Sequence, residues 1–206
     1  VLKETLVAHK RVLFNGNGYT DEWVEEAAKR GLPNLKSLPD ALPYFKEKES
    51  VDLFTKHGIF TKEEIDSRYE ILLENYSKSI HIESLTLQEM AKKDLMEGLI
   101  AYQSDLLEEA AGKKSLLGEK SATFEIETLK AIDEAQGKMS EALKKLAADT
   151  TVAEGKTEVL EQASYYQKTI LADMDEVRKY ADAAEALVPD SYLGYPTYGQ
   201  MLFSLR

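Results

Sequence analysis

The chain has 206 residues, and 43% of them are hydrophobic, which is enough to bury the core of one large or two small domains. Its formal net charge of −11 repels phosphate backbones and anionic lipids, so we expect neither nucleic acid nor membrane partners. It has no cysteine, no export signal and no apolar run long enough to span a bilayer, so we expect a cytoplasmic protein. Because no methionine starts the chain and its first residues already read as the middle of a helix, we expect a piece of a longer polypeptide.

The first expected helix covers Glu4–Phe14 and ends at the run Asn15-Gly16-Asn17-Gly18. Asn and Gly tolerate positive φ angles, so this run predicts a turn that leads into a second helix. A glycine-rich turn before a helix can also hold a phosphate group on its free backbone N–H groups. The run lacks the Lys-Ser/Thr of a P-loop and the third glycine of a dinucleotide-binding fingerprint, so we favour a plain turn over a ligand loop.

Short helices separated by loops are expected in the rest of the first third. One covers residues 20–30, because Thr20 suits its N-cap. Three prolines make residues 32–43 a loop with a single helical turn. Another short helix covers residues 50–57 and is closed by Gly58.

Long amphipathic helices are expected from Thr61 onward. Thr61-Lys62-Glu63-Glu64 fits a capping box, in which the hydroxyl and the carboxylate satisfy each other's free backbone N–H groups. Thr86-Leu87-Gln88-Glu89 fits a second capping box, so we expect the helix to break or bend between about Ile82 and Leu85 before a new one starts. Apolar residues at helical spacing predict one buried stripe before this break: Ile65, Tyr69, Leu72, Tyr76 and Ile80.

Three further stripes predict three long helices between residues 86 and 188. A Gly/Lys/Ser linker over 112–121 separates the first from the second, which ends near 149–151, and Pro189 ends the third. Consecutive long helices with short connections pack antiparallel, so we expect an all-α fold in which shorter helices and loops precede an up-down-up bundle. The stripes are Leu87, Ala91, Leu95, Leu99, Tyr102, Leu106 and Ala110; Ile132, Ala135, Met139, Leu143 and Leu146; and Val159, Ala163, Tyr166, Ile170, Met174, Val177, Ala181, Ala184 and Val188.

No residue pattern predicts a catalytic, cofactor-binding or metal site. The histidines His9, His57 and His81 lack the i, i+4 spacing with which a helix chelates a metal, and His57 suits a structural role at a helix end. There is no Ser-His-Asp pattern and no cysteine nucleophile. Tyr166 and Met174 lie on a core stripe, so we expect them to be packing residues. The adjacent acid pairs are expected on solvated helix faces: Glu25-Glu26, Glu63-Glu64 and Glu108-Glu109.

The segment after Pro189 is aromatic and apolar, and each Å² of apolar surface gains about 25 cal/mol on burial. We therefore expect this tail to dock on another surface of the chain or of a neighbour, most plausibly on the first third around Trp23 or Phe54. Pro196 and Thr197 suit the first turn of a short terminal helix. The residues expected to dock are Tyr195, Tyr198, Leu202 and Phe203, with Tyr198, Leu202 and Leu205 on one side of that helix.

Several segments stand out in order along the chain: His9–Tyr19, Trp23 with Arg30-Gly31-Leu32, Leu53–Gly58, Ser67–Tyr76 and, at the end, Tyr195-Pro196-Thr197-Tyr198 with Leu202-Phe203. These segments resemble, in the same order, the C-terminal part of type III glutamine synthetases. The resemblance extends over essentially the whole chain and is most specific over residues 9–91. The stretch from Leu38 through Phe60 and Tyr69 is also similar to the end of the catalytic domain in glutamine synthetases generally.

The resemblance implies a parent enzyme that condenses glutamate with ammonia through a γ-glutamyl phosphate, using ATP and Mg²⁺ or Mn²⁺. It implies that residues 1–83 are the helical tail of the catalytic domain and that residues 84–206 are a C-terminal helical extension with a docked aromatic tail. The family's ligand-binding residues lie upstream, so none maps onto this chain, and we expect the chain alone to be inactive.

The expected role is therefore that of a scaffold which contacts other parts of the synthetase and neighbouring subunits of a homo-oligomer. The alternative is a free-standing helical interaction module that binds a partner helix in the groove of its bundle. The complete reading frame distinguishes them, because only the first requires a catalytic domain before Val1.

Overall fold

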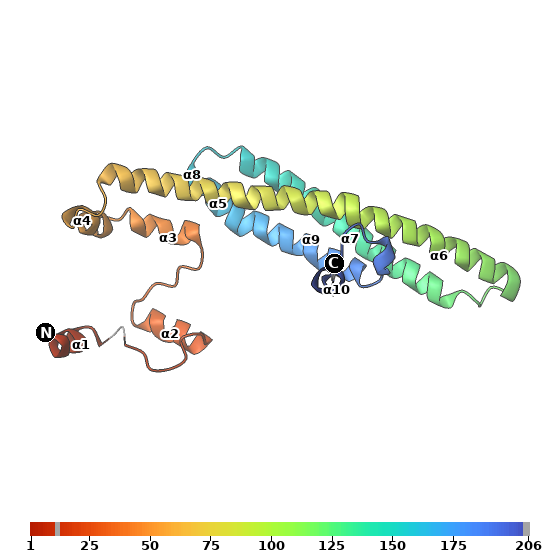
Figure 1. The fold of residues 1–206 in the computed structure, drawn as a ribbon, viewed down its shortest axis with the longest axis horizontal. Coiled ribbons are helices and arrows are strands. Elements are labelled where there is room, and N and C mark those ends of the chain that lie inside the picture. Colours follow the sequence, from red (N-terminus) through yellow and green to blue (C-terminus); the bar gives the residue numbers. More distant parts are fainter. Residues whose placement is uncertain (11–12, 204–206) are drawn as a thin grey trace. The chain divides into compact units, whose positions relative to one another are not determined.

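The computed structural model describes residues 1–10 and 13–203, which form helices and loops and contain no β-strand (Figure 1). The predicted all-α fold class is thereby confirmed. The chain divides into two compact units, residues 1–65 and 66–206. Within the described ranges, no helix combines the length and the apolar character that crossing a bilayer requires. The expected boundary after residue 83 concerns the domains of the parent protein and stays a prediction.

In its described residues, 1–10 and 13–65, the first unit contains four short helices and a small aromatic core. The core consists of Phe45, Phe54 and Phe60, whose ring centroids lie 5.3 to 6.4 Å apart. Gly31 and Gly58 follow helix ends with φ angles of 73° and 64°, a region that favours glycine. The helices are α1 (Leu2–Ala8), α2 (Asp21–Lys29), α3 (Leu38–Phe45) and α4 (Lys48–Lys56). The first is shorter than predicted, since it ends at Ala8 instead of Phe14.

The first capping box is confirmed at the start of the next helix, α5 (Lys62–Met90). The Thr61 backbone N–H donates to Glu64 Oε2 at 2.8 Å, and the Glu64 N–H donates to Thr61 Oγ1 at 3.2 Å. Both groups would otherwise be among the unpaired donors of a helix N-terminus.

The second unit is a bundle of three long helical segments in up-down-up order, as predicted for residues 86–188 (Figure 1). In the middle segment, α7 packs against α6 on one side and α9 on the other. The first and third segments each contain one π-helical stretch. The segments are α5, η2 (Ala91–Leu95) and α6 (Met96–Leu117); α7 (Thr123–Glu154); and α8 (Val159–Tyr165), η3 (Tyr166–Ile170) and α9 (Leu171–Glu185).

The predicted helix break between Ile82 and Leu85 is wrong. The helix α5 continues through it, and Thr86 Oγ1 donates to the Ile82 carbonyl at 2.8 Å instead of capping a new helix. A hydroxyl satisfied by the carbonyl four residues earlier is compatible with an unbroken helix. The irregularity lies further on, in η2. The linker is also shorter than predicted, because α6 continues to Leu117 before Gly118 turns the chain with a φ angle of 94°.

The three buried stripes predicted between residues 86 and 188 are confirmed, but the stripe predicted before them, from Ile65 to Ile80, is wrong at one position. Leu72 is 42% exposed, whereas its neighbour Leu73 is fully buried. The buried face of α5 continues through the polar residues Ser77 and Ser84, which a search for apolar spacing alone does not find. The core of the bundle unites the predicted stripes around Leu99, Ile132, Met139, Leu146, Ile170 and Val177.

Candidate functional site

The histidines that the sequence analysis considered lie in different local surroundings. His9 and His57 are exposed at the C-terminal ends of α1 and α4, and His81 is half-buried in the bundle. Across residues 1–10 and 13–203, no group of three or more His, Asp or Glu side chains is arranged to hold a metal ion. Two of the predicted acid pairs contribute a side chain that contacts residues nearby in the sequence. Glu64 caps α5, and Glu26 forms an ion pair with Arg30 at 2.7 Å.

The Asn15–Gly18 run leads into a turn in which Asn17 accepts hydrogen bonds from the two residues that follow the run. The Tyr19 N–H donates to Asn17 Oδ1 at 3.0 Å, and Thr20 Oγ1 donates to the Asn17 carbonyl at 3.1 Å. Beside it, Phe14 stacks on Trp23 with ring centroids 4.2 Å apart. The Tyr19 N–H, which a phosphate loop would present to its ligand, is already bound here.

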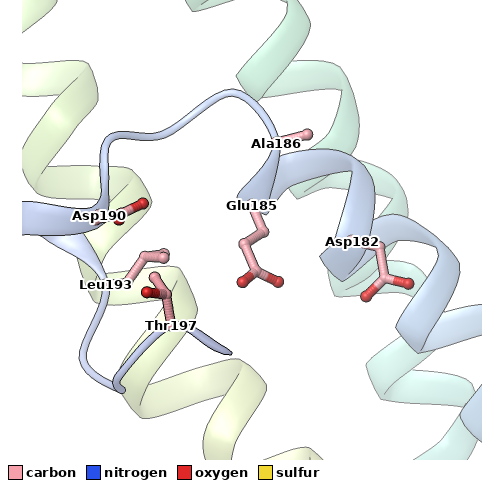
Figure 2. Close-up of a pocket in the computed structure, with 6 residues that line it drawn as sticks. All are labelled: Asp182, Glu185, Ala186, Asp190, Leu193 and Thr197. Atoms are coloured by element: carbon pink, nitrogen blue, oxygen red, sulfur yellow. The ribbon is translucent and has the colours of Figure 1, made fainter. Parts of the chain in front are cut away.

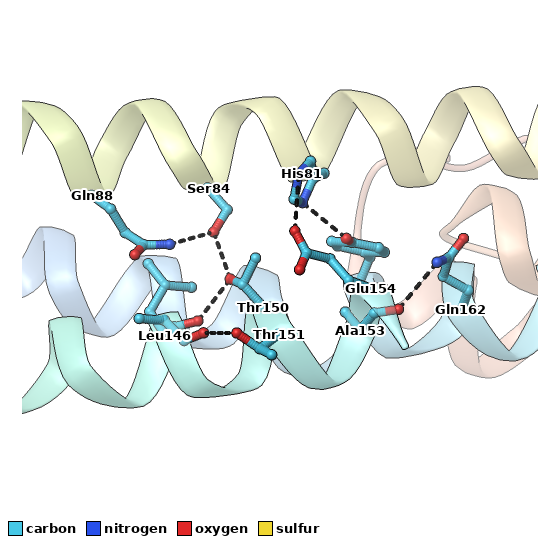
Figure 3. A network of polar contacts seen from close by, with 11 residues as sticks. His81, Ser84, Gln88, Leu146, Thr150, Thr151, Ala153, Glu154 and Gln162 are labelled. Carbon is cyan, nitrogen blue, oxygen red and sulfur yellow. Dashed lines mark hydrogen bonds and ion pairs between the residues drawn. The ribbon is translucent and has the colours of Figure 1, made fainter. Parts of the chain in front are cut away.

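A polar seam lines the interface between α5 and α7, where the apolar stripes predicted only packing (Figure 3). Ser84 and Thr150 are buried, and their hydroxyl oxygens lie 3.0 Å apart. Gln88 donates to Ser84 Oγ at 3.3 Å, and Thr150 donates to the Leu146 carbonyl at 2.7 Å. Each contact supplies a partner to a hydroxyl or amide that would be costly to bury unpaired.

The same seam continues to His81, which touches two other segments (Figure 3). Its Nδ1 lies 3.1 Å from the Tyr166 hydroxyl of η3, and its Nε2 lies 3.4 Å from Glu154 at the end of α7. Burial raises the pKa of Tyr166, and the charge of Glu154 adds to the effect. Tyr166 is therefore a packing residue, as predicted, that also carries a polar contact.

The tail following α9 is fastened to the bundle by a strap, residues 192–195. Tyr192 Oη donates to Asp105 Oδ2 at 2.5 Å, and its ring lies 5.0 Å from that of Tyr102. The Tyr192 carbonyl passes so close to α6 that a Cβ atom at Gly98 would lie only 2.0 Å from its oxygen. Gly98 therefore permits an approach that a larger residue would obstruct.

The strap also packs against η2 and α9. A Cβ atom at Gly194 would lie 3.0 Å from Asp94 Cβ of η2. Tyr195 packs against the bundle core, and burial, with the charges of Glu185 and Asp182, raises its pKa to about 12. Gly98 and Gly194 thus permit the close approach of the strap to the bundle, and Tyr192 and Tyr195 pack the strap against its core.

The last helix, α10 (Tyr198–Phe203), follows the strap and forms as predicted. The Thr197 N–H donates a hydrogen bond to Gln200 Oε1 at 2.9 Å, and the Gln200 N–H donates to Thr197 Oγ1 at 3.3 Å. Its apolar residues Tyr198, Leu202 and Phe203 do not dock on the bundle, since they are 77%, 76% and 81% exposed, and their docking on the first third of the chain or on a neighbour stays a prediction. Of the predicted docking residues, only Tyr195 packs against the core. Leu205 lies outside the described residues.

Two hollows flank the strap. A smaller one of about 330 Å³ is lined by the acidic side chains of Asp182, Glu185 and Asp190 (Figure 2). A larger one of about 790 Å³ lies between η2, α9 and the tail, and Met90 and Tyr198 contribute to its lining. A hollow of this size is within the range of binding sites in proteins.

Sequence reasoning missed the strap and the polar seam for different reasons. Gly98 and Tyr192 are far apart in the chain, and neither has a local pattern that marks the contact. The seam had a visible signal, because Ser77, Ser84 and Gln88 continue the stripe of Leu73 at helical spacing. A stripe search that allows serine and glutamine would have found it.

Comparison with known proteins identifies the relatives of this chain. The sequence profile of the glutamine synthetase C-terminal domain matches residues 1–114. A protein named glutamine synthetase from Butyrivibrio fibrisolvens is 71% identical over the whole chain. A type-3 glutamine synthetase from Dictyostelium discoideum and a glutamine synthetase from Bacteroides fragilis (strain YCH46) are each 31% identical, over 98% and 99% of the chain.

The chain spans only 28% to 29% of the length of these relatives. The resemblance to type III glutamine synthetases that the sequence segments indicated is confirmed by these matches. The chain belongs to the glutamine synthetase C-terminal domain family.

Proposed function

We propose that this chain is the scaffold and subunit-contact region of a glutamine synthetase. The parent enzyme would join ammonia to glutamate in the cytoplasm, with ATP and Mg²⁺ or Mn²⁺ bound by residues outside this chain. The proposal rests on the family match and on the 71% identity to a glutamine synthetase of which the chain spans 29%.

We assign the proposed contact between subunits to the exposed face of α10. The strap holds the start of this helix on the bundle, yet Tyr198, Leu202 and Phe203 project large apolar surfaces into solvent. Contiguous apolar patches on a protein surface usually mark an interaction site. A neighbouring subunit of the parent homo-oligomer would cover this face.

The test uses the complete synthetase that carries this chain. Leu202→Asp and Phe203→Asp together would place two charges on the α10 face, and sedimentation would measure the mass of the assembly. We expect smaller assemblies with unchanged helix content, because a buried charge without a partner opposes subunit contact. If the active site depends on the assembly, the rate of glutamine formation, assayed with ATP, glutamate, ammonia and Mg²⁺, should decrease as the assembly dissociates.

A matched control is available at the end of α6. Leu116 and Leu117 are also strongly exposed, at 85% and 76%, but lie away from the strap. Leu116→Asp with Leu117→Asp makes the same chemical change and should leave the assembly intact. An unchanged mass for the α10 variant, or equal dissociation of both variants, would refute the assignment of the contact to α10.

A further inference from the structure

Two carboxyl groups, those of Asp173 and Asp149, lie within hydrogen-bonding reach of each other where α7 packs against α9. Asp173 of α9 is only 2% exposed, and Lys145 of α7 donates from Nζ to its Oδ1. Asp149 follows Lys145 by one helical turn and accepts a hydrogen bond from Tyr165 Oη at 2.8 Å. Asp173, Lys145, Asp149 and Tyr165 form a cluster that the proposed subunit contacts do not use.

One atom of this cluster lacks a partner. Asp173 Oδ2 is buried, and no side chain or backbone group within residues 1–10 and 13–203 donates a hydrogen bond to it. An ionised carboxyl group can only accept hydrogen bonds, so the charged form would leave this buried oxygen unsatisfied. A proton on Oδ2 would make the atom a donor, and the neighbouring carboxylate of Asp149 could accept from it.

Burial and the neighbouring Asp149 favour the protonated form of Asp173, whereas Lys145 opposes it. Burial is the largest influence and raises the pKa of this carboxyl group, and Asp149 raises it further, against the opposing attraction of Lys145. The hydrogen bond to Asp149 raises the pKa of Tyr165, as expected when the acceptor is an anion. Glu176 on α9 acts on Lys145, while Lys156 lies 4.9 Å from the centre of the Tyr165 ring.

We propose that Asp173 and Asp149 share one proton across the α7–α9 interface, with Asp173 Oδ2 as the donor and the Asp149 carboxylate as the acceptor. The interface is then a proton-binding site built into the bundle. The folded protein binds a proton there that the unfolded chain releases at lower pH.

The direction of the pH effect follows from linkage. An aspartate in the unfolded chain loses its proton near pH 3.9, whereas Asp173 keeps its proton to a higher pH in the folded protein. Between these two values the folded state binds more protons, so stability decreases as the pH rises. The stabilising contribution of the proton is complete below the unfolded value and is lost as the pH rises through the folded value.

A direct test is the titration of aspartate carboxyl carbons by ¹³C NMR in the full chain. Asp173 should titrate at a higher pH than the exposed Asp175 two residues later on the same helix. Asp149→Asn should lower the midpoint of Asp173, because the new amide group can donate to its carboxylate. A wild-type midpoint at or below that of Asp175 overturns the proposal.

Thermal unfolding provides a second test with a matched control. Asp173→Asn keeps an oxygen for Lys145 and adds N–H donors for Asp149, but it cannot titrate. The melting temperature of the wild type relative to this variant should fall between pH 4 and 8, by about 3 to 5 °C for each pH unit that separates the folded and unfolded pKa values. Asp175→Asn should show no such trend. A pH-independent difference between wild type and Asp173→Asn would overturn the proposal.

Discussion

The contact between Gly98 and the strap can be tested by a single added methyl group. In Gly98→Ala, the Cβ atom would lie 2.0 Å from the Tyr192 carbonyl oxygen and 3.1 Å from its carbonyl carbon. Non-bonded carbon atoms normally approach only to about 3.5 Å, so the strap must move away from α6. The displacement would weaken the hydrogen bond from Tyr192 to Asp105 and the ring contact between Tyr192 and Tyr102.

These losses can be weighed against the gain in helix propensity. The hydrogen bond contributes about 1 kcal/mol and the ring pair about 1 kcal/mol, and overpacking adds roughly 1 kcal/mol of strain. Alanine in a helix interior is more favourable than glycine by about 1 kcal/mol. We therefore expect Gly98→Ala to lower the free energy of unfolding by about 2 kcal/mol, or the melting temperature by about 4 to 8 °C.

Gly137→Ala is the matched control, because this glycine lies within α7 and a Cβ atom there would meet nothing within 4 Å. It should raise the melting temperature by about 2 to 4 °C through helix propensity alone. Calorimetry would measure both variants, and limited proteolysis would report whether residues 190–197 are released in Gly98→Ala. Equal stabilisation by the two substitutions, with the strap still protected, would refute the close approach.

Two further predictions concern the core and the tail. Val177 is fully buried, so Val177→Asp should lower the free energy of unfolding by about 3 to 5 kcal/mol. Glu176→Ala on the exposed face should change the free energy of unfolding by less than about 0.5 kcal/mol. Equal shifts of the two variants in chemical denaturation would show that the wrong helix face was assigned. Deleting residues 192–206 should lower the melting temperature and increase the binding of an apolar dye, because Tyr192 and Tyr195 pack on the core. Deleting only residues 198–206 should leave the melting temperature nearly unchanged, because Tyr198, Leu202 and Phe203 are exposed. Identical melting of both truncations and the full chain would contradict the packing of the strap.

Local sequence patterns predicted the helices where the neighbouring residues alone control the geometry. The capping box of Thr61 and Glu64 formed because the chain before it leaves the helix at Gly58 and the free N–H groups need partners. The same pattern at Thr86 did not begin a helix. There the preceding turns carry Ser84, whose hydroxyl group meets Thr150 of α7, and this contact is made from within a continuous α5.

The amino-acid sequence by itself determined that the protein is all-α, that residues 86–188 form a three-segment bundle and which residues of the last two segments form its core. Periodicity suffices for this because a helix buries one face whatever its neighbour is. Only the tertiary structure decided which part of the aromatic tail is covered. Hydrophobicity indicates that Tyr195 and Phe203 both gain from burial, but it does not specify a surface. The surface is set by the close approach of Tyr192 to Gly98 and by the Tyr192 hydroxyl group that reaches Asp105, and in this arrangement Tyr195 is partly buried against the core while Phe203 stays exposed.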